Sequence, residues 1–248
     1  MNLAWPRLLV VIPALNEEET IGAVIADART HLASDVLVID DGSSDATAAN
    51  ARGAGATVLS LPYNLGVGGA LRTGLRYAAG HGYNRVLQLD GDGQHAAREA
   101  KRVLDLLEEG HDLVIGSRFA AGYQLGHTRR LTMGVLSRIV SRRLGARITD
   151  TTSGFRAMGP AAIELFSRRY PADYLSDTVE ALLLAGDAGL RVAEVDVEMR
   201  QRQGGVPSSP GAKSLYHFVR LLLSIGLQPS VKGPARRAAA SSFNGVTG

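Results

Sequence analysis

The sequence predicts an α/β protein in which a mostly parallel sheet is covered by helices on both faces. Its first half alternates short apolar runs with longer segments of helical periodicity, which is the pattern that consecutive βα units produce. Polar residues, paired acids and glycines follow these apolar runs, as expected where strands end at a ligand-binding edge. With 248 residues, the chain is long enough for one large domain with a short appendage.

Hydrophobic periodicity places the elements of the first half in the order that a parallel sheet requires. Strands are predicted at residues 8–12, 36–39 and 57–61, in the run that ends at Asp90, and at residues 113–115. Helices are predicted at residues 18–31, from Ser44 or Asp45 to about residue 54, from a glycine-rich loop at residues 64–69 to about residue 81, and at residues 97–109. Glu18 and Glu19 would then lie in the first turn of the first helix, where acidic residues suit the helix dipole.

After Arg118 the alternation gives way to mostly helical patterns. The predicted elements are a basic amphipathic helix at residues 131–144, a polar loop at 150–156, a helix from Pro160, a helix at 177–184, a half-buried strand at 192–199, a Gly/Pro/Ser loop at 203–212 and an apolar-rich helix at 214–227. We therefore predict one domain over residues 1–212, a C-terminal amphipathic helix over 213–231 and a disordered basic tail over 232–248.

Composition disfavours several classes of protein. The chain has no cysteine, which excludes disulfides and thiolate chemistry. We expect no signal peptide and no membrane span, because no apolar stretch approaches the roughly 18 residues that a span needs. A net charge of +3 and a pI of about 9.4 suit phosphorylated substrates or an anionic membrane. With 5% aromatic residues and no recognisable nucleic-acid-binding pattern, we expect no nucleic-acid partner.

The centre of the predicted site is the sequence L-D-G-D-G-Q-H, which contains Asp90 and Asp92. In an extended chain residues i and i+2 point to the same side, so these two carboxylates would face one way. Carboxylates held that close repel each other unless a cation lies between them, and oxygen ligands suit Mg²⁺ or Mn²⁺. Gln94 and His95 follow directly and could complete or orient the ligand shell. A lone D-x-D can also be an acidic turn between a strand and a helix.

Three other polar loops are predicted to end parallel strands beside the Asp90 loop. They lie at residues 13–17, 40–45 and 64–69. Ligands of open α/β sheets bind outside the carboxyl ends of the strands, so all of these loops would surround one crevice. The glycines of residues 64–69 lack the full dinucleotide or phosphate-loop pattern, and we interpret them as positions of close helix packing.

These motifs resemble, in order, those of the family 2 glycosyltransferases of the GT-A fold. They are V-V-I-P-A-L-N-E-E, V-I-D-D-G-S-S-D-A-T, N-L-G-V-G-G-A-L-R-T-G, L-D-G-D-G-Q-H and I-G-S-R-F. The later I-T-D-T-T-S-G-F-R-A is similar to the branch that makes dolichyl- and polyprenyl-phosphate sugars, and the resemblance spans roughly residues 8–225. It implies a Rossmann-like GT-A sheet and metal-dependent, inverting transfer from a GDP- or UDP-sugar to a polyprenyl phosphate.

The resemblance also implies roles for individual residues. Substrate-binding residues would be Pro13, Asn16, Glu17, Asp40, Asp41, Asp90, Gly91, Arg129, Arg202 and Lys213. Asp92, Gln94 and Asp90 would hold the metal, and Asp92, Arg118 and Asp177 would be catalytic. Arg118 matches the family motif, whereas the pattern R-x-x-G-x-S-K is stretched between Arg202 and Lys213. Each basic residue here, Arg200 included, could also be an ordinary solvated charge.

The acceptor decides whether a general base is needed. A phosphate acceptor is already ionised, whereas a hydroxyl acceptor needs a base, for which Asp177 is the candidate. Asp177 is equally suited to capping its helix, and Asp150 could instead help to position the acceptor. A nucleotide-sugar-binding sensor is the non-enzymatic alternative.

The predicted basic helices at residues 131–144 and 214–227 bear on location. Such helices can lie in a membrane interface, and they can equally pack against the sheet domain or a partner. We expect a cytoplasmic enzyme with peripheral contact on the inner face of the cell membrane. The sequence leaves the sugar, the nucleotide and the oligomeric state open.

Overall fold

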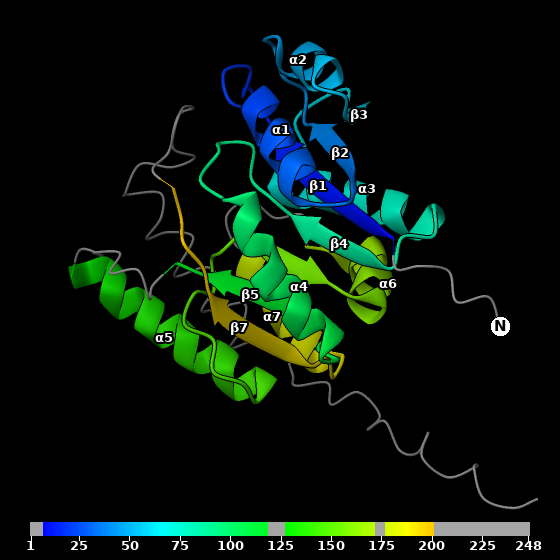
Figure 1. Cartoon of the computed structure of the whole chain (residues 1–248). Helices are drawn as coiled ribbons and strands as arrows, with labels where there is room; N and C mark the ends of the chain where they lie inside the picture. Colours follow the sequence, from blue (N-terminus) through cyan, green and yellow to red (C-terminus); the bar gives the residue numbers. More distant parts are fainter. Residues whose placement is uncertain (1–6, 119–126, 172–176, 201–248) are drawn as a thin grey trace, which may run out of the picture.

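The computed structural model describes residues 7–118, 127–171 and 177–200, and these residues form one seven-stranded sheet. The strand order is β3-β2-β1-β4-β6-β5-β7, and Figure 1 labels all of these strands except β6. The strands are β1 (Leu8–Ala14), β2 (Asp35–Asp40), β3 (Thr57–Ser60), β4 (Arg85–Gln88), β5 (Leu113–Ser117), β6 (Arg156–Met158) and β7 (Val192–Asp196). Every neighbouring pair is parallel except those of β6, which runs antiparallel to both β4 and β5. The predicted mostly parallel α/β sheet is confirmed.

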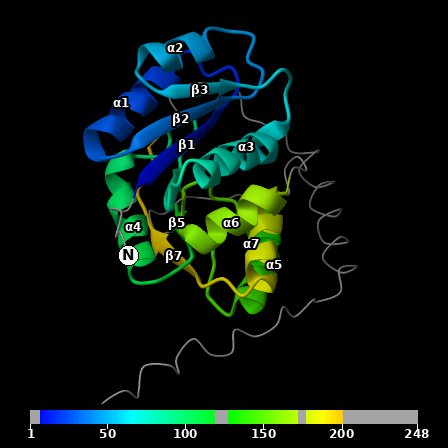
Figure 2. The ribbon, with the colours of Figure 1, turned by 90° about the vertical axis from the view of Figure 1, so that its right-hand side faces the viewer.

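Helices cover both faces of the sheet, as the two views in Figure 1 and Figure 2 show. They are α1 (Ile21–His31), α2 (Thr47–Gly53), α3 (Gly66–Gly80), η1 (Ala97–Glu99), α4 (Ala100–Glu108), α5 (His127–Leu144), α6 (Pro160–Arg169) and α7 (Asp177–Asp187). Side chains of β1 alternate between two cores. Leu9 and Val11 face the core formed with α3, α5, α6 and α7, and Val10 and Ile12 face the core formed with α1, α2 and α4. Burial on both faces explains why this strand reads as an unbroken apolar run.

The first helix begins later than predicted, whereas the second begins two residues after Asp45, one of its two predicted capping residues. The Glu17 carbonyl accepts the N–H groups of Thr20 and Ile21, so α1 begins at Ile21 and not at Glu18. Glu18 instead accepts the N–H of Ala46 with its carboxylate, at 2.9 Å. Asp45 binds the N–H of Thr47, the first residue of α2, at 2.9 Å.

The glycine-rich segment is mostly helical, which corrects the prediction of a loop over residues 64–69. α3 begins at Gly66, so Gly66 to Gly69 lie in its first turns. The close approach to the sheet is made further along the helix, at Gly74. A Cβ atom there would lie 2.5 Å from Cγ1 of Val11, well inside van der Waals contact.

The short strand β6 was not predicted, and it decides the geometry of the site. Its first residue, Arg156, was assigned to a polar loop but pairs with Gln88 of β4 and Ile115 of β5. These partners stand at or near the carboxyl ends of their strands, so residues 149–155, which precede β6, lie along the carboxyl edge of the sheet. The predicted loop at 203–212, helix at 214–227 and tail lie outside the described residues.

Within the described ranges, no helix has both the length and the apolar character needed to cross a lipid bilayer.

Candidate active site

The loops that follow β1 and β2 are bound to each other at the carboxyl edge. Asn16 adopts a left-handed conformation, with φ of 55°, which asparagine tolerates better than most residues. Its N–H donates to Ser43 Oγ at 3.0 Å, and its side-chain oxygen accepts the N–H of Ser44 at 2.9 Å. Asn16 therefore holds the loop after β2 beside the loop after β1.

The paired acids at the end of β2 are both buried, and they have different partners. Asp40 accepts the N–H of Ser43 at 3.0 Å. Asp41 accepts the N–H of Leu65 at 2.7 Å, so its carboxylate is bound to the start of α3. Burial raises the pKa of Asp41 and the charge of Asp40 adds to that rise, while the N–H groups of Leu65 and Gly66 partly oppose it.

The loop after β1 also contacts the acidic loop after β4. The Thr20 hydroxyl lies 2.7 Å from the Gly91 carbonyl and 3.0 Å from Oε2 of Glu17. A Cβ atom at Gly91 would lie 3.3 Å from Glu17 Cγ and 3.5 Å from the carbonyl oxygen of Pro13. Glycine at this position therefore allows the two loops to meet.

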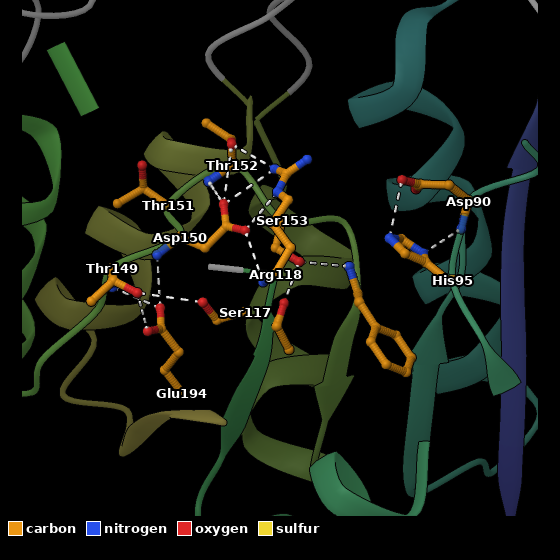
Figure 3. A network of polar contacts seen from close by, with 12 residues as sticks. Asp90, His95, Ser117, Arg118, Thr149, Asp150, Thr151, Thr152, Ser153 and Glu194 are labelled. Carbon is orange, nitrogen blue, oxygen red and sulfur yellow. Dashed lines mark hydrogen bonds and ion pairs between the residues drawn. The ribbon is translucent and has the colours of Figure 1, made fainter. Parts of the chain in front are cut away.

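The two acids after β4 differ in exposure. The side chain of Asp90 is 39% exposed, whereas Asp92 is 8% exposed and accepts the N–H of Gln94 at 3.0 Å. His95 is buried and its Nδ1 accepts the N–H of Asp90 at 3.0 Å, so Nε2 carries the proton in the neutral ring. Nε2 lies 3.5 Å from Oδ2 of Asp90, and the ring stacks on Phe155. His95 thus binds the backbone of Asp90 and lies beside its carboxylate, as Figure 3 shows.

Residues 149–155 connect the acidic loop to Arg118. At one end, a Cβ atom on Gly154 would lie 2.6 Å from Oδ1 of Asp90, so a larger residue at this position would displace that carboxylate. At the other end, Asp150 forms a two-pronged ion pair with Arg118 (Figure 3). Nε of Arg118 lies 2.7 Å from Oδ2, and Nη2 lies 3.2 Å from Oδ1.

Arg118 is therefore no ordinary solvated charge. Its carboxylate partner is wholly buried, while its own side chain is 20% exposed. Nη2 also donates to the Thr152 hydroxyl at 2.9 Å. Asp150, the candidate for positioning the acceptor, has its carboxylate on Arg118, and that role stays a prediction.

A buried arginine that sequence reasoning missed lies behind this loop. Arg156 is fully buried, and its guanidinium donates to the carbonyl of Ser153 at 2.9 Å and to that of Thr178 at 3.2 Å. It thereby ties residues 149–155 to the start of α7. The only sequence signal was its place in the motif T-T-S-G-F-R.

Asp177 is the first residue of α7 and is 7% exposed. Burial raises its pKa, and the charges of Glu180 and Asp90 raise it further, while the Thr178 N–H and the Arg156 charge lower it in part. Through Arg156, which binds the Thr178 carbonyl, the start of α7 is linked to residues 149–155.

The remaining basic candidates are Arg129, Arg200, Arg202 and Lys213. Arg129 lies in α5, and Arg202 and Lys213 lie outside the described residues. Arg200, at the end of the alternating segment, pairs with Asp27 of α1 at 3.1 Å and so holds α1 against the chain after β7.

Asp90 and Asp92 are the two carboxylates that the loop after β4 offers a cation. Within residues 7–118, 127–171 and 177–200, no three His, Cys, Asp or Glu side chains are grouped as a metal site. Such a donor set fits Mg²⁺ or Mn²⁺, which commonly take one or two carboxylates and complete their shell with water and substrate phosphates.

A separate hollow of about 380 Å³ opens at the amino ends of β1, β2 and β3. Its lining includes Arg29, Ser34, Asp35, Tyr77 and Tyr83. Ligands of open α/β sheets bind at the opposite, carboxyl ends of the strands, where the acids and Arg118 gather. We therefore place the candidate site at the carboxyl edge.

The chain is similar in sequence to enzymes that make lipid-linked sugars. It is 31% identical over 219 residues to a polyprenol monophosphomannose synthase of Mycolicibacterium smegmatis, covering 83% of this chain and 82% of that one. It is 28% identical over 217 residues to a UDP-N-acetylglucosamine–dolichyl-phosphate N-acetylglucosaminyltransferase of Methanococcus voltae, covering 79% and 86%.

The fold also matches a solved structure. Glucosyl-3-phosphoglycerate synthase of Mycobacterium tuberculosis, in complex with Mn²⁺, UDP-glucose and phosphoglyceric acid, aligns with a TM-score of 0.71 at 26% identity, covering 91% of this chain and 82% of that one. This similarity confirms the predicted GT-A architecture. The model of the Glycosyl transferase family 2 matches residues 9–166, so the chain belongs to this family and is a glycosyltransferase.

Proposed function

We propose that this enzyme transfers a hexosyl group from a nucleoside-diphosphate sugar to a polyprenyl phosphate, with inversion at the anomeric carbon and with Mg²⁺ or Mn²⁺. One observation carries the proposal. Residues 149–155 contact Asp90 of the acidic loop at Gly154 and hold Arg118 through Asp150. A carboxylate pair suited to a cation-bound diphosphate and a guanidinium suited to a phosphate therefore share one edge of the sheet. The polyprenyl acceptor is supported by the names of the relatives.

The donor nucleotide would lie against the loops after β1 and β2. Pro13, Asn16 and Glu17 would line its pocket, and Asp40 would accept a base N–H or a ribose hydroxyl. We prefer Asp40 to Asp41 for this contact, because the Asp41 carboxylate binds the start of α3. Asp90, held by His95, would face the ribose or the leaving phosphate.

The metal would be held by Asp92, with Asp90 and Gln94 beside it. When bound there, the cation would supply Lewis-acid stabilisation of the diphosphate charge. Arg118 would bind a substrate phosphate through its planar guanidinium group, with Asp150 fixing the plane. Arg129, Arg202 and Lys213 would add positive charge for the same substrates.

The transfer step needs no proton acceptor. An ionised phosphate oxygen of the acceptor forms a bond to the anomeric carbon, and the bond from that carbon to the donor diphosphate oxygen breaks. The electron pair leaves with the nucleoside diphosphate, and the product is a polyprenyl-phosphate sugar.

A second candidate keeps the donor and uses a hydroxyl acceptor, with Asp177 as the base. The raised pKa of Asp177 favours it, because a base with a higher pKa accepts a proton more readily. The Asp177→Asn variant separates the two candidates: a hydroxyl acceptor would lose turnover, and a phosphate acceptor would keep it.

The test is a donor screen with the full chain. Labelled UDP- and GDP-sugars are incubated with a short-chain polyprenyl phosphate, with and without Mn²⁺, and label is counted in the butanol-soluble lipid. We expect metal-dependent transfer into lipid. Label that enters an oligosaccharide supplied in place of the lipid, and not the lipid itself, would support the hydroxyl route, and donor binding without turnover would support a sensor.

A further inference from the structure

We propose that Glu194 is a positioning residue that fixes Arg118 for phosphate recognition, acting through Asp150. This inference rests on the proposed function in one respect, namely that a substrate phosphate binds at Arg118. Glu194 lies on β7, a strand at the edge of the sheet, and its side chain reaches the loop before β6 (Figure 3).

The Glu194 carboxylate accepts hydrogen bonds from one short segment of chain. Oε2 accepts the N–H of Thr149 at 2.7 Å and the N–H of Asp150 at 2.9 Å. Oε1 accepts the Thr149 hydroxyl at 2.6 Å. Within the described ranges, Glu194 forms no ion pair. These three hydrogen bonds are therefore the contacts that stabilise its charge.

The Glu194 carboxylate acts on the orientation of the Arg118 guanidinium group through Asp150. Two consecutive N–H groups bound to one oxygen fix the local backbone, and hence the direction in which the Asp150 side chain leaves it. Asp150 is wholly buried and binds Nε and Nη2 of Arg118 together. A planar guanidinium group that is bound through two of its nitrogen atoms takes its orientation from the carboxylate that binds it. Loss of the Glu194 contact would therefore misdirect Arg118 at the edge of the site.

A purely structural role, in which Glu194 only fastens the loop to β7, makes a different prediction. Fastening would contribute to stability independently of Arg118. Positioning requires that Glu194 has little effect on activity once Arg118 is gone. A double-mutant cycle measures this coupling directly.

The variants are Glu194→Leu, Glu194→Gln, Arg118→Ala and the combination of Glu194→Leu with Arg118→Ala. We expect Glu194→Leu to lower kcat/KM by about 10- to 100-fold through a raised KM, as small misplacements of binding groups do. Glu194→Gln should restore most activity, because its oxygen can accept both N–H groups while its NH₂ donates to Thr149. Asp196→Asn, an exposed acid on the same strand, is the control and should match wild type. Glu194→Ala replaces the leucine variant if that protein does not fold.

The double variant decides the outcome. We expect it to be about as active as Arg118→Ala alone. Losses that multiply would overturn the inference, since Glu194 would then act without Arg118.

Binding measurements separate the two sources of phosphate. Titration of UDP and GDP with Mn²⁺, without acceptor, reports on the donor diphosphate, and KM for the polyprenyl phosphate reports on the acceptor. A Glu194→Leu protein that is unchanged in both would refute the positioning role. If wild type transfers no sugar to lipid, the proposed function fails, and the nucleotide titration still tests Glu194.

Discussion

At the scale of single residues, Asp92 is the sharpest test of metal dependence. Asparagine at this position keeps an oxygen that can accept the Gln94 N–H and removes the charge. We expect Asp92→Asn to lower Mn²⁺-stimulated turnover by about 100-fold or more, because Lewis-acid stabilisation is worth several kcal/mol. Initial rates measured against Mn²⁺ concentration check this. Asp105→Asn removes an exposed acid from α4 as the control, and an unaltered metal response in Asp92→Asn would remove Asp92 from the ligand set.

Asp177 makes a prediction about stability and pH. Its raised folded pKa, caused first by burial, means that the native protein holds this proton more tightly than the unfolded chain does. Stability from this group is therefore present below the ordinary aspartate pKa and is lost as pH rises through the raised pKa. We expect the Tm of Asp177→Asn, relative to the Tm of the wild type, to be higher at pH 7 than at pH 4. A Tm difference that does not change with pH would contradict the shift.

At the scale of elements, the packing of α3 on β1 depends on Gly74. An added Cβ would lie 2.5 Å from Val11 Cγ1, so Gly74→Ala overpacks the interface and should lower the free energy of unfolding by about 1–3 kcal/mol. Gly134, inside α5, is the matched control, because among the described residues no atom beyond its own helix backbone and chain neighbours lies within 4 Å of an added Cβ. Gly134→Ala should stabilise by about 0.5–1 kcal/mol. Urea unfolding measures both, and equal effects would refute the packing role.

At the scale of the whole molecule, the exposed side chains of α5 bear on the predicted membrane contact. Met133, Leu136 and Val140 of this helix are buried in the core, whereas Val135 is exposed. Arg138 and Arg142 are exposed. The buried apolar residues of α5 pack internally, so its exposed arginines and Val135 are the groups that we predict to contact anionic lipid.

We expect the full chain to float with anionic liposomes at low salt and to dissociate from them at high salt. Arg138→Glu combined with Arg142→Glu should weaken binding by more than about tenfold, given roughly 1 kcal/mol per basic residue near the surface. Neutral liposomes are the control. A protein that stays in the soluble fraction with anionic vesicles at low salt would disprove the membrane contact.

The single domain over residues 1–212 stays a prediction.

The strands that carry the acidic loops were predictable because their signals are local. Apolar runs at β1, β2 and β4 are followed directly by polar residues, and the carboxyl ends of parallel strands meet at one edge whatever the details of packing. Helix starts were less predictable. Asp41 binds the N–H of Leu65, and Glu18 binds the N–H of Ala46. Both hydrogen bonds join loops that are far apart along the sequence.

The sequence by itself determined the parallel part of the sheet, the acidic loop with Asp90 and Asp92, and the family to which the chain belongs. Only the tertiary structure showed that β6 is inserted antiparallel between β4 and β5. It alone showed that Arg118 is held by Asp150, 32 residues away, and Asp150 by Glu194, 44 residues away. The physical reason is that a three-residue strand and a buried ion pair are specified by partners distant along the chain, and periodicity records only near neighbours.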